Sequence, residues 1–583
     1  MKRRLLFYTL LLCLGVPRLR AAETLPLAGE WRFALDRTDA GTNEHWFAKN
    51  LPDKITLPGI LEAQGYGDEI STTTPWVLSL YDHFWFLRAD YAADTNAGSV
   101  KVPFLCQPVR HYLGAAWYQR DLEIPKDWSG QRVVLFLERP HWKSTVWLDE
   151  KEIGSEISLC TPHEFDFGVV PPGRHRLTIR VDNRMILPYR PDTHSVSDSL
   201  DNAWNGMVGK MELRATSLVW VDNVRIFPDV KKKSIHAQMT LHNSSGIRAS
   251  GKVEFYVESC PGTKPIKVIP SSENFNNWSE TNASIEADID LGNQAELWNE
   301  FSPALYSLRA EVGGGTDKFN FDEDTTNTFG LRDFHAEGNQ FILNGHPIYF
   351  RGTHFGGDFP LTGYPPTDVA SWKKIFQTCK DYGLNHMRFH SWCPPEAAFT
   401  AADELGFYLQ VECGMWNDIS PGSRMEAMLY DETKRILRDF GNHPSLLLIS
   451  AMNEAHGNWQ PSLTKWVKHF RAEDPRHLYT PDTGWSLIDS PGQPLNGGAD
   501  YLAIGRIGSG RVRGEHGWFG GDYGDSIAGV KVPVIGHEVG QWCAYPDFEV
   551  IKKFTGFMRP GNYEIFRDSA AAHGLFEIGR AHV

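Results

Sequence analysis

Two glutamates each stand directly after a short apolar run. Glu454 follows Leu446 to Ile449 in the stretch LLLISAMNEAHG, with the amide of Asn453 immediately before it. Glu538 follows the stretch VPVIGH in the same way. A short apolar run bounded by polar residues is typical of a buried strand. We therefore expect both carboxylates at the ends of buried strands.

Two carboxyl groups that face each other across a pocket can hydrolyse a glycosidic bond. One protonates the leaving oxygen and the other meets the oxocarbenium-like centre, and a spacing of about 5 to 5.5 Å implies retention of configuration. The carboxyl group that acts as the acid must start the reaction protonated, and the other must start ionised. For either glutamate taken alone, an ion pair with a nearby Arg or Lys is the alternative. The presence of both favours catalysis.

Alternating strands and helices surround both glutamates. Helices are predicted near residues 367–382, 395–405, 424–440, 461–473 and 562–573, with short apolar strands between the first of them. The seven strands found in order predict a (β/α)8 TIM barrel that lacks its eighth strand. The carboxyl ends of barrel strands open onto one face, so Glu454 and Glu538 are expected at the same mouth.

Other polar residues are predicted at the ends of further barrel strands. They are candidates for sugar contact: His354, Arg388, His390, Glu412 and His537. For Glu412 a structural ion pair is the alternative. For each histidine the alternative is a structural role, with the ring hydrogen-bonded within the protein. Trp392, Trp416 and Trp542 follow strand ends and could stack on a pyranose, with Trp542 as the first choice.

The sequence predicts neither a metal site nor a cofactor. No H-E-x-x-H or similar spacing occurs, and His456 beside Glu454 is too little to predict a cation. Eight cysteines show no C-x-x-C spacing, which argues against a zinc ribbon or a disulfide framework. We interpret them as mostly buried thiols.

The region before the barrel is rich in strands. Residues 23–218 alternate apolar and polar side chains and predict a β-sandwich. Residues 219–331 repeat the pattern in shorter segments and predict an immunoglobulin-like β-sandwich. An Asn344-Gly345 turn predicts a hairpin at the start of the barrel domain, residues 332–576.

Both chain ends carry their own signals. Residues 1–22 have a basic start, an apolar run and small residues at the end, which predicts a Sec-type signal peptide and a secreted or periplasmic protein. Cys13 leaves a lipid anchor as an alternative. Residues 577–583 can be encoded by a run of codons that resembles a widely used sequencing-adapter sequence. We interpret them as a non-native tail on a C-terminally truncated chain.

The net charge of the chain excludes some classes of binding partner. A formal net charge of -14, with no basic stripe beyond Lys231 to Lys233, disfavours nucleic acid and anionic membrane surfaces. We expect an oligosaccharide or glycoside as the partner instead.

Several motifs together resemble glycoside hydrolase family 2, which contains β-galactosidases, β-glucuronidases and β-mannosidases. AAWYQRDLEIPKDWSGQRVVLFLE and HRLTIRVDN resemble its jelly-roll β-sandwich, which implies a sugar-binding-like domain over residues 23–218. GNHPSLLLISAMNEAHG resembles its acid/base signature and VPVIGHEVGQW its nucleophile signature. The resemblance implies that Glu454 is the acid/base, that Glu538 is the nucleophile, and that Asn453 contacts the sugar 2-hydroxyl. It also places Arg388 on the nucleophile side of the pocket. The β-galactosidase and β-glucuronidase branches usually show R-x-x-H at this point, whereas here His390 follows Arg388 by two residues.

The resemblance implies a retaining exo-β-glycosidase of carbohydrate metabolism. The favoured substrates are β-galactosides or α-L-arabinopyranosides, with β-glucuronidase and β-mannosidase as alternatives within the family. A non-catalytic glycan-binding protein on a decayed scaffold is the alternative from another class.

Overall fold

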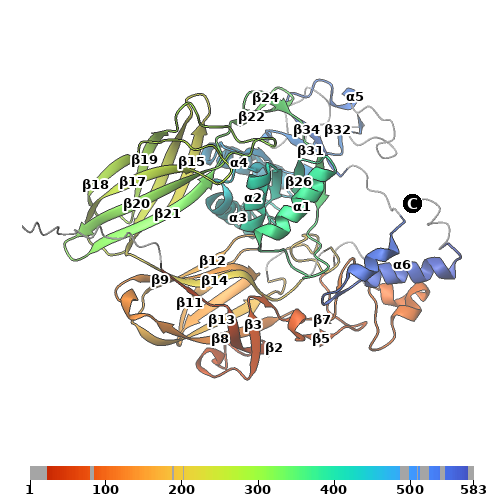
Figure 1. The fold of residues 1–583 in the computed structure, drawn as a ribbon. Coiled ribbons are helices and arrows are strands. Elements are labelled where there is room, and N and C mark those ends of the chain that lie inside the picture. The colour runs from red at the N-terminus through yellow and green to blue at the C-terminus, as the bar shows by residue number, and fades with distance from the viewer. Residues whose placement is uncertain are drawn as a thin grey trace, which may run out of the picture.

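The computed structural model describes residues 23–78, 84–186, 189–200, 203–485, 498–507, 510–511, 524–538 and 545–575. Two β-sandwiches lie beside a body of parallel strands and helices (Figure 1). The signal peptide and the tail predicted at the two ends fall outside the described residues.

The first sandwich consists of two antiparallel sheets. One has the strand order β1 (Glu23–Pro26), β14 (Gly206–Thr216), β9 (Arg132–His141) and β12 (His163–Val169), with β4 (Gly59–Ile60) also paired to β14. The other has the order β11 (Lys151–Ile157), β10 (Lys143–Leu148), β13 (Gly173–Asp182), β8 (Ala115–Ile124), β2 (Gly29–Asp36) and β3 (Asp53–Leu57). Their inner faces form one apolar core.

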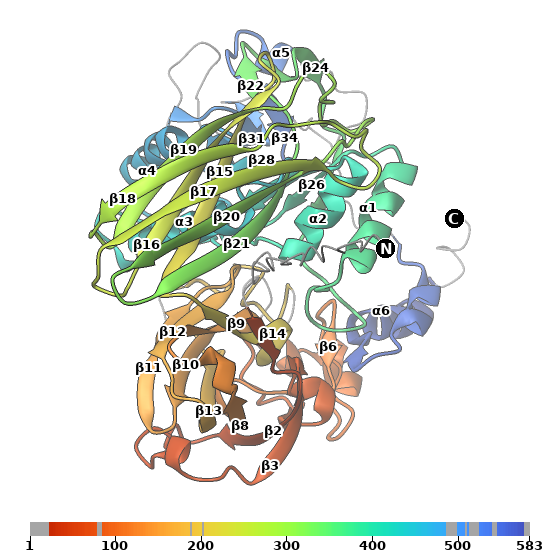
Figure 2. The same cartoon turned by 60° about the vertical axis from the view of Figure 1, so that its left-hand side comes forward.

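The second sandwich also pairs two antiparallel sheets. They have the orders β15 (Val219–Asp229), β16 (Ser234–Asn243), β19 (Asn282–Asp290), and β18 (Ser271–Trp278), β17 (Ala249–Ser259), β20 (Tyr306–Thr316), β21 (Asn320–Phe329). Every second residue of β16 is buried, as the apolar alternation predicts. Figure 2 shows the second sandwich above the first, with α1 and α2 beside it. The domain limits at residues 218 and 331 stay predictions.

A short antiparallel sheet leads into the parallel region. Its strands are β22 (Phe334–Glu337), β23 (Gln340–Leu343) and β24 (His346–Ile348). The turn between β23 and β24 has φ of 54° at Asn344 and 80° at Gly345, so the predicted two-residue hairpin is confirmed.

The parallel strands form two groups. The first has the order β25 (Gly352–Phe355), β26 (His386–Phe389), β27 (Tyr408–Glu412), β28 (Leu446–Ser450), β29 (Leu478–Thr480), and the second β30 (Thr483–Gly484), β31 (Leu502–Ile504), β34 (Val534–Gly536). β29 and β30 are separated by Pro481, which has no N–H to donate, and by Asp482. Within the described residues β25 and β34 do not pair, so no closed barrel forms there.

The predicted helices are present. They are α1 (Val369–Asp381), α2 (Glu396–Leu405), α3 (Arg424–Phe440), α4 (Trp459–Glu473) and α6 (Gly561–Ala572). Asp368 and Ser423 cap α1 and α3 by accepting hydrogen bonds from backbone N–H groups three residues on. Among the described residues no helix is long and apolar enough to span a membrane.

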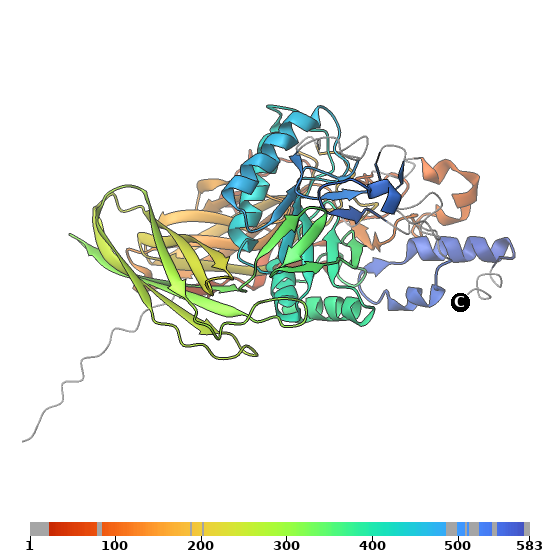
Figure 3. The same cartoon turned by 90° about the horizontal axis from the view of Figure 1, so that it is seen from above.

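α6 lies away from the parallel strands. Figure 3 shows it at the far side of the molecule from the second sandwich. The strand before it, β35 (Met558–Arg559), pairs with β6 (Gln107–Pro108), and Asp568 on α6 accepts a hydrogen bond from Nζ of Lys101 at 2.9 Å. This helix therefore packs on the segment of the first sandwich around Lys101 and β6 instead of covering a barrel strand.

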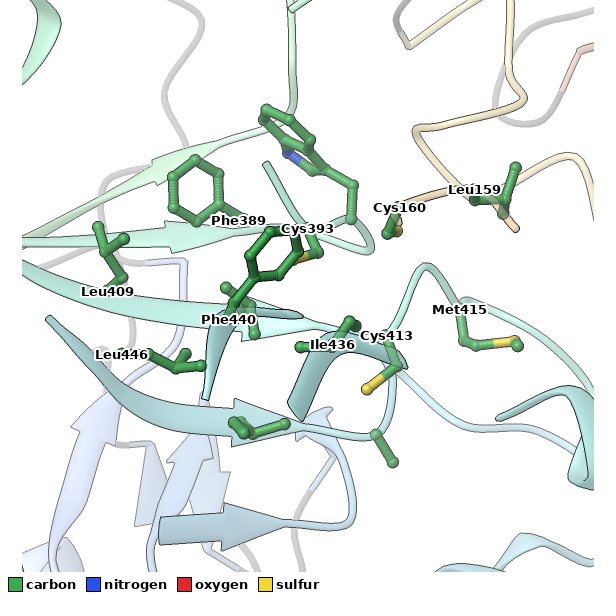
Figure 4. Packing of buried hydrophobic residues seen from close by; sticks show 14 of the residues in the cluster. Leu159, Cys160, Phe389, Cys393, Leu409, Cys413, Met415, Ile436, Phe440 and Leu446 are labelled. Atoms are coloured by element: carbon green, nitrogen blue, oxygen red, sulfur yellow. The ribbon is translucent and has the colours of Figure 1, made fainter. Parts of the chain in front are cut away.

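One apolar cluster joins the first sandwich to the parallel sheet. Leu159 and Cys160 of the sandwich pack in the same cluster as Cys393, Cys413 and the barrel-side residues around them (Figure 4). All the described cysteines are free thiols and most are buried, as the sequence predicts. This shared core fixes the loops of the sandwich over the carboxyl ends of the strands.

Candidate active site

Arg388, near the end of β26, contacts both predicted catalytic regions. Its Nη1 donates to Oε1 of Glu538 at 3.3 Å. Its Nη2 donates to Oδ1 of Asn453 at 2.7 Å and to Oγ1 of Thr483 at 2.9 Å. Its Nε donates to Oε1 of Glu412 at 2.7 Å. The planar guanidinium holds these four residues together in one geometry, which a lysine ammonium cannot reproduce.

Glu412 ends β27 and is fully buried. Its Oε1 accepts hydrogen bonds from Arg388 and from Oγ1 of Thr483, the latter at 2.7 Å, and its Oε2 accepts one from the backbone N–H of Ser391 at 2.5 Å. Both oxygens are thus taken by protein donors. Of the two interpretations offered by the sequence, the structure shows the ion pair, and Glu412 orients Arg388.

Glu538 lies just after β34 among donors. Oε1 of Glu538 is 3.1 Å from Nε2 of His390 and 3.2 Å from Nε2 of His537, besides the contact with Arg388. Burial alone would raise the pKa of Glu538, but the neighbouring His537, Arg388 and His354 outweigh it and lower the pKa. The carboxyl group is therefore ionised at neutral pH, as a nucleophile must be.

Both glutamates have unusual backbone conformations. The φ angles are 40° at Glu454 and 49° at Glu538, in the left-handed region that side chains other than glycine rarely adopt. Such residues cost about 1–3 kcal/mol each and cluster at functional sites. Here the turn after each strand directs the carboxylate out of the strand and toward the mouth.

Gly484 leaves room for the Glu454 side chain. A Cβ at this position would lie 2.7 Å from Cγ of Glu454 and 3.2 Å from Cε1 of His537. Gly484 also has φ of 105°, which disfavours any larger residue. The end of β30 therefore needs glycine so that Glu454 and His537 can both approach it.

Asp482, which the sequence analysis did not single out, supports the loop that carries Glu454. Its Oδ1 accepts a hydrogen bond from the backbone N–H of Ala455 at 2.7 Å, and the side chain is fully buried. Burial raises the pKa of Asp482 well above its ordinary value, backbone hydrogen bonds oppose this, and Glu412 and Glu454 add to it. The only sequence signal was an acid beside a strand end.

Asn453 presents an unused donor beside Glu454. Its Oδ1 accepts from Arg388, and its side chain is fully buried. Its Nδ2 has no hydrogen-bond partner among the described residues. A buried amide left unpaired costs about 1–3 kcal/mol, so this N–H group is suited to a hydroxyl supplied by a ligand.

His194 was also missed by sequence reasoning, because it belongs to the first sandwich. It stands in the segment between β13 and β14, and its backbone N–H donates to Oγ of Ser391 at 3.0 Å. Its ring lies 4.6 Å from that of His390, centroid to centroid. His354, an exposed residue at the end of β25, stands 4.8 Å from the same ring. Three imidazoles thus meet next to Glu538.

The aromatic candidates divide into three cases. Trp392 is buried in the apolar core, and its Nε1 donates to the backbone oxygen of Phe355 at 2.9 Å, so it has a packing role. Trp416 is half-buried, with its ring 5.0 Å from that of His390, and stays a candidate for stacking on a sugar. Trp542, the first choice from the sequence, lies outside the described residues.

Comparison with known proteins agrees with this geometry. The family description "Glycosyl hydrolases family 2, TIM barrel domain" matches residues 334–483. A β-glucuronidase of Paenibacillus borealis is 24% identical over 466 residues, which covers 74% of this chain and 68% of the relative. A β-galactosidase of Clostridium acetobutylicum is 23% identical over 487 residues, which covers 78% of this chain and 49% of the relative.

A solved structure shares the fold. The family 2 β-galacturonidase from Eisenbergiella tayi, bound to galacturonate, matches with a TM-score of 0.62 at 17% identity, over 88% of this chain and 81% of that one. The family match covers the strands that carry Arg388, Glu412, Asn453 and Glu454. The chain belongs to glycoside hydrolase family 2 and is a glycoside hydrolase.

Proposed function

We propose that the chain is a retaining exo-β-glycosidase in which Glu454 is the acid/base and Glu538 the nucleophile. The observation that carries the proposal is the position of Arg388. One guanidinium contacts Glu538 after β34 and Asn453 beside Glu454 after β28. Two strand ends that are far apart in sequence thereby meet at one site, as double displacement requires.

The reaction proceeds in two steps. In the first, a Glu538 oxygen attacks the anomeric carbon while Glu454 gives its proton to the leaving oxygen, and a covalent glycosyl-enzyme forms. In the second, Glu454 takes a proton from water, the water oxygen attacks the anomeric carbon, and the bond to Glu538 breaks. Two inversions give net retention. The unpaired Nδ2 of Asn453 would donate to the sugar 2-hydroxyl.

For the sugar we propose a β-galactoside or an α-L-arabinopyranoside. The side of the site near Glu538 is lined by His194, His354 and His390. Burial lowers the pKa of His194, to about 3, and lowers that of His390, so these two imidazoles are uncharged at neutral pH. Arg388 is already engaged with protein acceptors. This lining favours a neutral sugar rich in hydroxyl groups.

A β-glucuronide is the second candidate. The relative from Paenibacillus borealis is a β-glucuronidase, and the structural neighbour from Eisenbergiella tayi binds galacturonate. A uronate would need a cation in the site to balance its carboxylate. The two candidate substrates therefore differ in charge, because the galactoside or arabinopyranoside is neutral and the glucuronide is an anion. Export by residues 1–22 to the periplasm or the medium is part of the same proposal and fits a polymer-derived substrate.

A panel of nitrophenyl glycosides tests the sugar. We expect hydrolysis of the β-galactoside or α-L-arabinopyranoside to exceed that of the β-glucuronide, β-mannoside and β-glucoside. The reverse order, with the β-glucuronide first, would select the second candidate. A folded chain that cleaves none of them yet retains a glycan on an array would support the glycan-binding alternative.

Azide rescue tests the roles of the two glutamates. With an activated substrate, Glu538→Gly should lose about 10⁴-fold or more in kcat, and added azide should restore turnover with the α-glycosyl azide as product. Glu454→Gly with azide should give the β-glycosyl azide, because the glycosyl-enzyme still forms. Identical anomers from the two variants would contradict the assignment.

A further inference from the structure

The imidazoles of His194, His354 and His390 form a cluster to which the two chemical steps above assign no covalent or proton-transfer role. One ring nitrogen of each lies within 4.8 Å of the others. The rings come from the first sandwich, from the end of β25 and from the turn after β26. The cluster exists only because the sandwich docks over the strand ends.

The fold holds His194 firmly in this place. Its backbone N–H donates to Ser391, and the backbone N–H of Trp416 donates to Oγ1 of the preceding Thr193 at 3.1 Å. The ring packs against Gly356, where an added Cβ would lie 2.5 Å from Cε1 of His194. A glycine therefore makes space for this imidazole, which indicates a built position.

The three rings differ in the partners of their nitrogens, and Nδ1 of His390 faces Oγ of Ser391 at 3.3 Å. His194 is 8% exposed, and its Nδ1 has no hydrogen-bond partner among the described residues. No hydrogen bond from the ring of His354 is recorded in the part of the chain that the structure describes, and its exposure gives solutes access. Nε2 of His390 stands 3.1 Å from Oε1 of Glu538, so a carboxylate adjoins the three rings.

This set of groups matches the preferences of a borderline divalent cation. Zn²⁺ binds neutral imidazole nitrogen at about 2.0–2.1 Å and commonly takes three such ligands with a fourth position for oxygen. Tetrahedral geometry at that bond length sets nitrogen atoms about 3.4 Å apart. The widest separation here exceeds this by about 1.4 Å, a distance that rotation of the exposed His354 side chain can close.

We propose that His194, His354 and His390 bind Zn²⁺ or a similar borderline cation, with Glu538 in reach as a fourth ligand. A cation held there occupies a carboxylate lone pair that attack on the anomeric carbon needs, and it fills the sugar site. Zn²⁺ is thus a reversible inhibitor. Binding of the ion stands independently of the proposed glycosidase function, whereas inhibition rests on it.

Binding is measured without any substrate. The whole chain, freed of metal with a chelator, is titrated with Zn²⁺ by calorimetry and with Co²⁺ by visible absorption. We expect one ion per chain and the intense visible bands of a four-coordinate Co²⁺ ion. The faint spectrum of octahedral, solvated Co²⁺, or calorimetric titration without one-to-one binding, would overturn the proposal.

Variants locate the ion. His354→Gln and His194→Gln should each weaken Zn²⁺ binding by at least about tenfold, since even residues that only support metal ligands cost 10 to 100-fold. His469→Gln is the matched control, because His469 is an exposed histidine on α4 that pairs with Glu473 at 2.9 Å. If His194→Gln disturbs docking of the sandwich, the Zn²⁺ affinity of His354→Gln still tests the location of the ion, because His354 is exposed. Unchanged affinity in His354→Gln would place the ion elsewhere.

Inhibition is then tested with the best glycoside of the panel. Zn²⁺ should raise KM more than it lowers kcat, a chelator should reverse the effect, and His354→Gln should need at least about tenfold more Zn²⁺ than the unmodified chain. Turnover that is insensitive to Zn²⁺ would overturn the inhibitory role while leaving the glycosidase proposal intact. A chain that binds Zn²⁺ but cleaves no glycoside would overturn the glycosidase proposal, and the inhibitory role with it, while leaving the binding of the ion intact.

Discussion

At the level of single residues, the site is organised by one cation and the acceptors around it. Together with His537 and His354, the guanidinium of Arg388 is a cause of the lowered pKa of Glu538. Glu412 and Thr483 fix the orientation of the guanidinium and so connect a buried acid to the reacting groups.

We expect Arg388→Gln to lower kcat/KM by about 10²-fold or more, because it removes the charge and the contacts that place Glu538. Loss of the guanidinium also removes a cause of the lowered pKa of Glu538, so this pKa rises. Since the ionised form is active, the acidic limb of the pH profile of kcat/KM should move to higher pH.

Arg388→Lys separates charge from position. It should lower the rate as well but leave the acidic limb nearer its original place. Arg438→Gln, on the outer helix α3, serves as a control with an unchanged profile. An acidic limb that stays fixed in Arg388→Gln would show that other groups set the ionisation of Glu538.

At the level of elements, the catalytic groups depend on how individual strands end. β28 and β34 each finish in a turn with a positive φ at the glutamate, and β30 finishes at Gly484. Asp482 ties the loop after β28 to the interruption between β29 and β30. These short breaks in regular pairing direct side chains into the mouth, whereas the strands themselves supply packing.

Gly484→Ala should lower kcat by about 10²-fold, because the new methyl group displaces Glu454. Gly383→Ala is the matched control, since Gly383 also has positive φ, 79°, but nothing lies within 4 Å of its added Cβ. Both changes should cost about 1–3 kcal/mol of unfolding free energy through backbone strain. Equal kcat values for the two variants would show that Gly484 matters for backbone conformation alone.

At the level of the whole molecule, the first sandwich completes the mouth. Glu432 on α3 is buried at this interface, where its Oε1 accepts hydrogen bonds from Oγ of Ser158 at 2.9 Å and from the backbone N–H of Cys160 at 2.9 Å. Arg139 of the sandwich donates to the backbone oxygen of Cys393 at 2.8 Å. The position of His194 follows from this docking.

Glu432 makes the stability of the interface depend on pH. Burial raises its pKa above the ordinary value of 4.5, although hydrogen bonds from Ser158 and Cys160 and the charge of Arg435 oppose this. The folded chain thus holds this proton to higher pH than the unfolded chain does. Its stabilising effect is complete below about pH 4.5 and is lost as pH rises through the folded pKa.

Glu432→Gln removes this titration and keeps an acceptor oxygen. The difference in Tm between variant and unmodified chain should therefore shift in favour of the variant as pH rises from about 4 to 8. Glu404→Gln, at an exposed glutamate on α2, should give a difference that does not vary in this way. A difference for Glu432→Gln that is constant with pH would contradict the argument.

The sequence by itself determined the elements and the two catalytic candidates. Periodicity of two and of 3.6 residues is local, so the helices from α1 to α4, the Asn344-Gly345 hairpin and the strand ends at Glu454 and Glu538 could be read from neighbouring residues. The chemistry of a carboxylate pair is a property of residue type. These are short-range facts.

Only the tertiary structure decided which side chains meet. The ion pair of Glu412 with Arg388, the support from Asp482 and the packing of α6 on the first sandwich all join residues far apart in the chain. The histidine cluster could not be read from the sequence for the same reason, because His194 comes from the first sandwich. No local spacing encodes such a contact, since it arises when apolar surfaces that the sequence leaves unpaired are buried against each other.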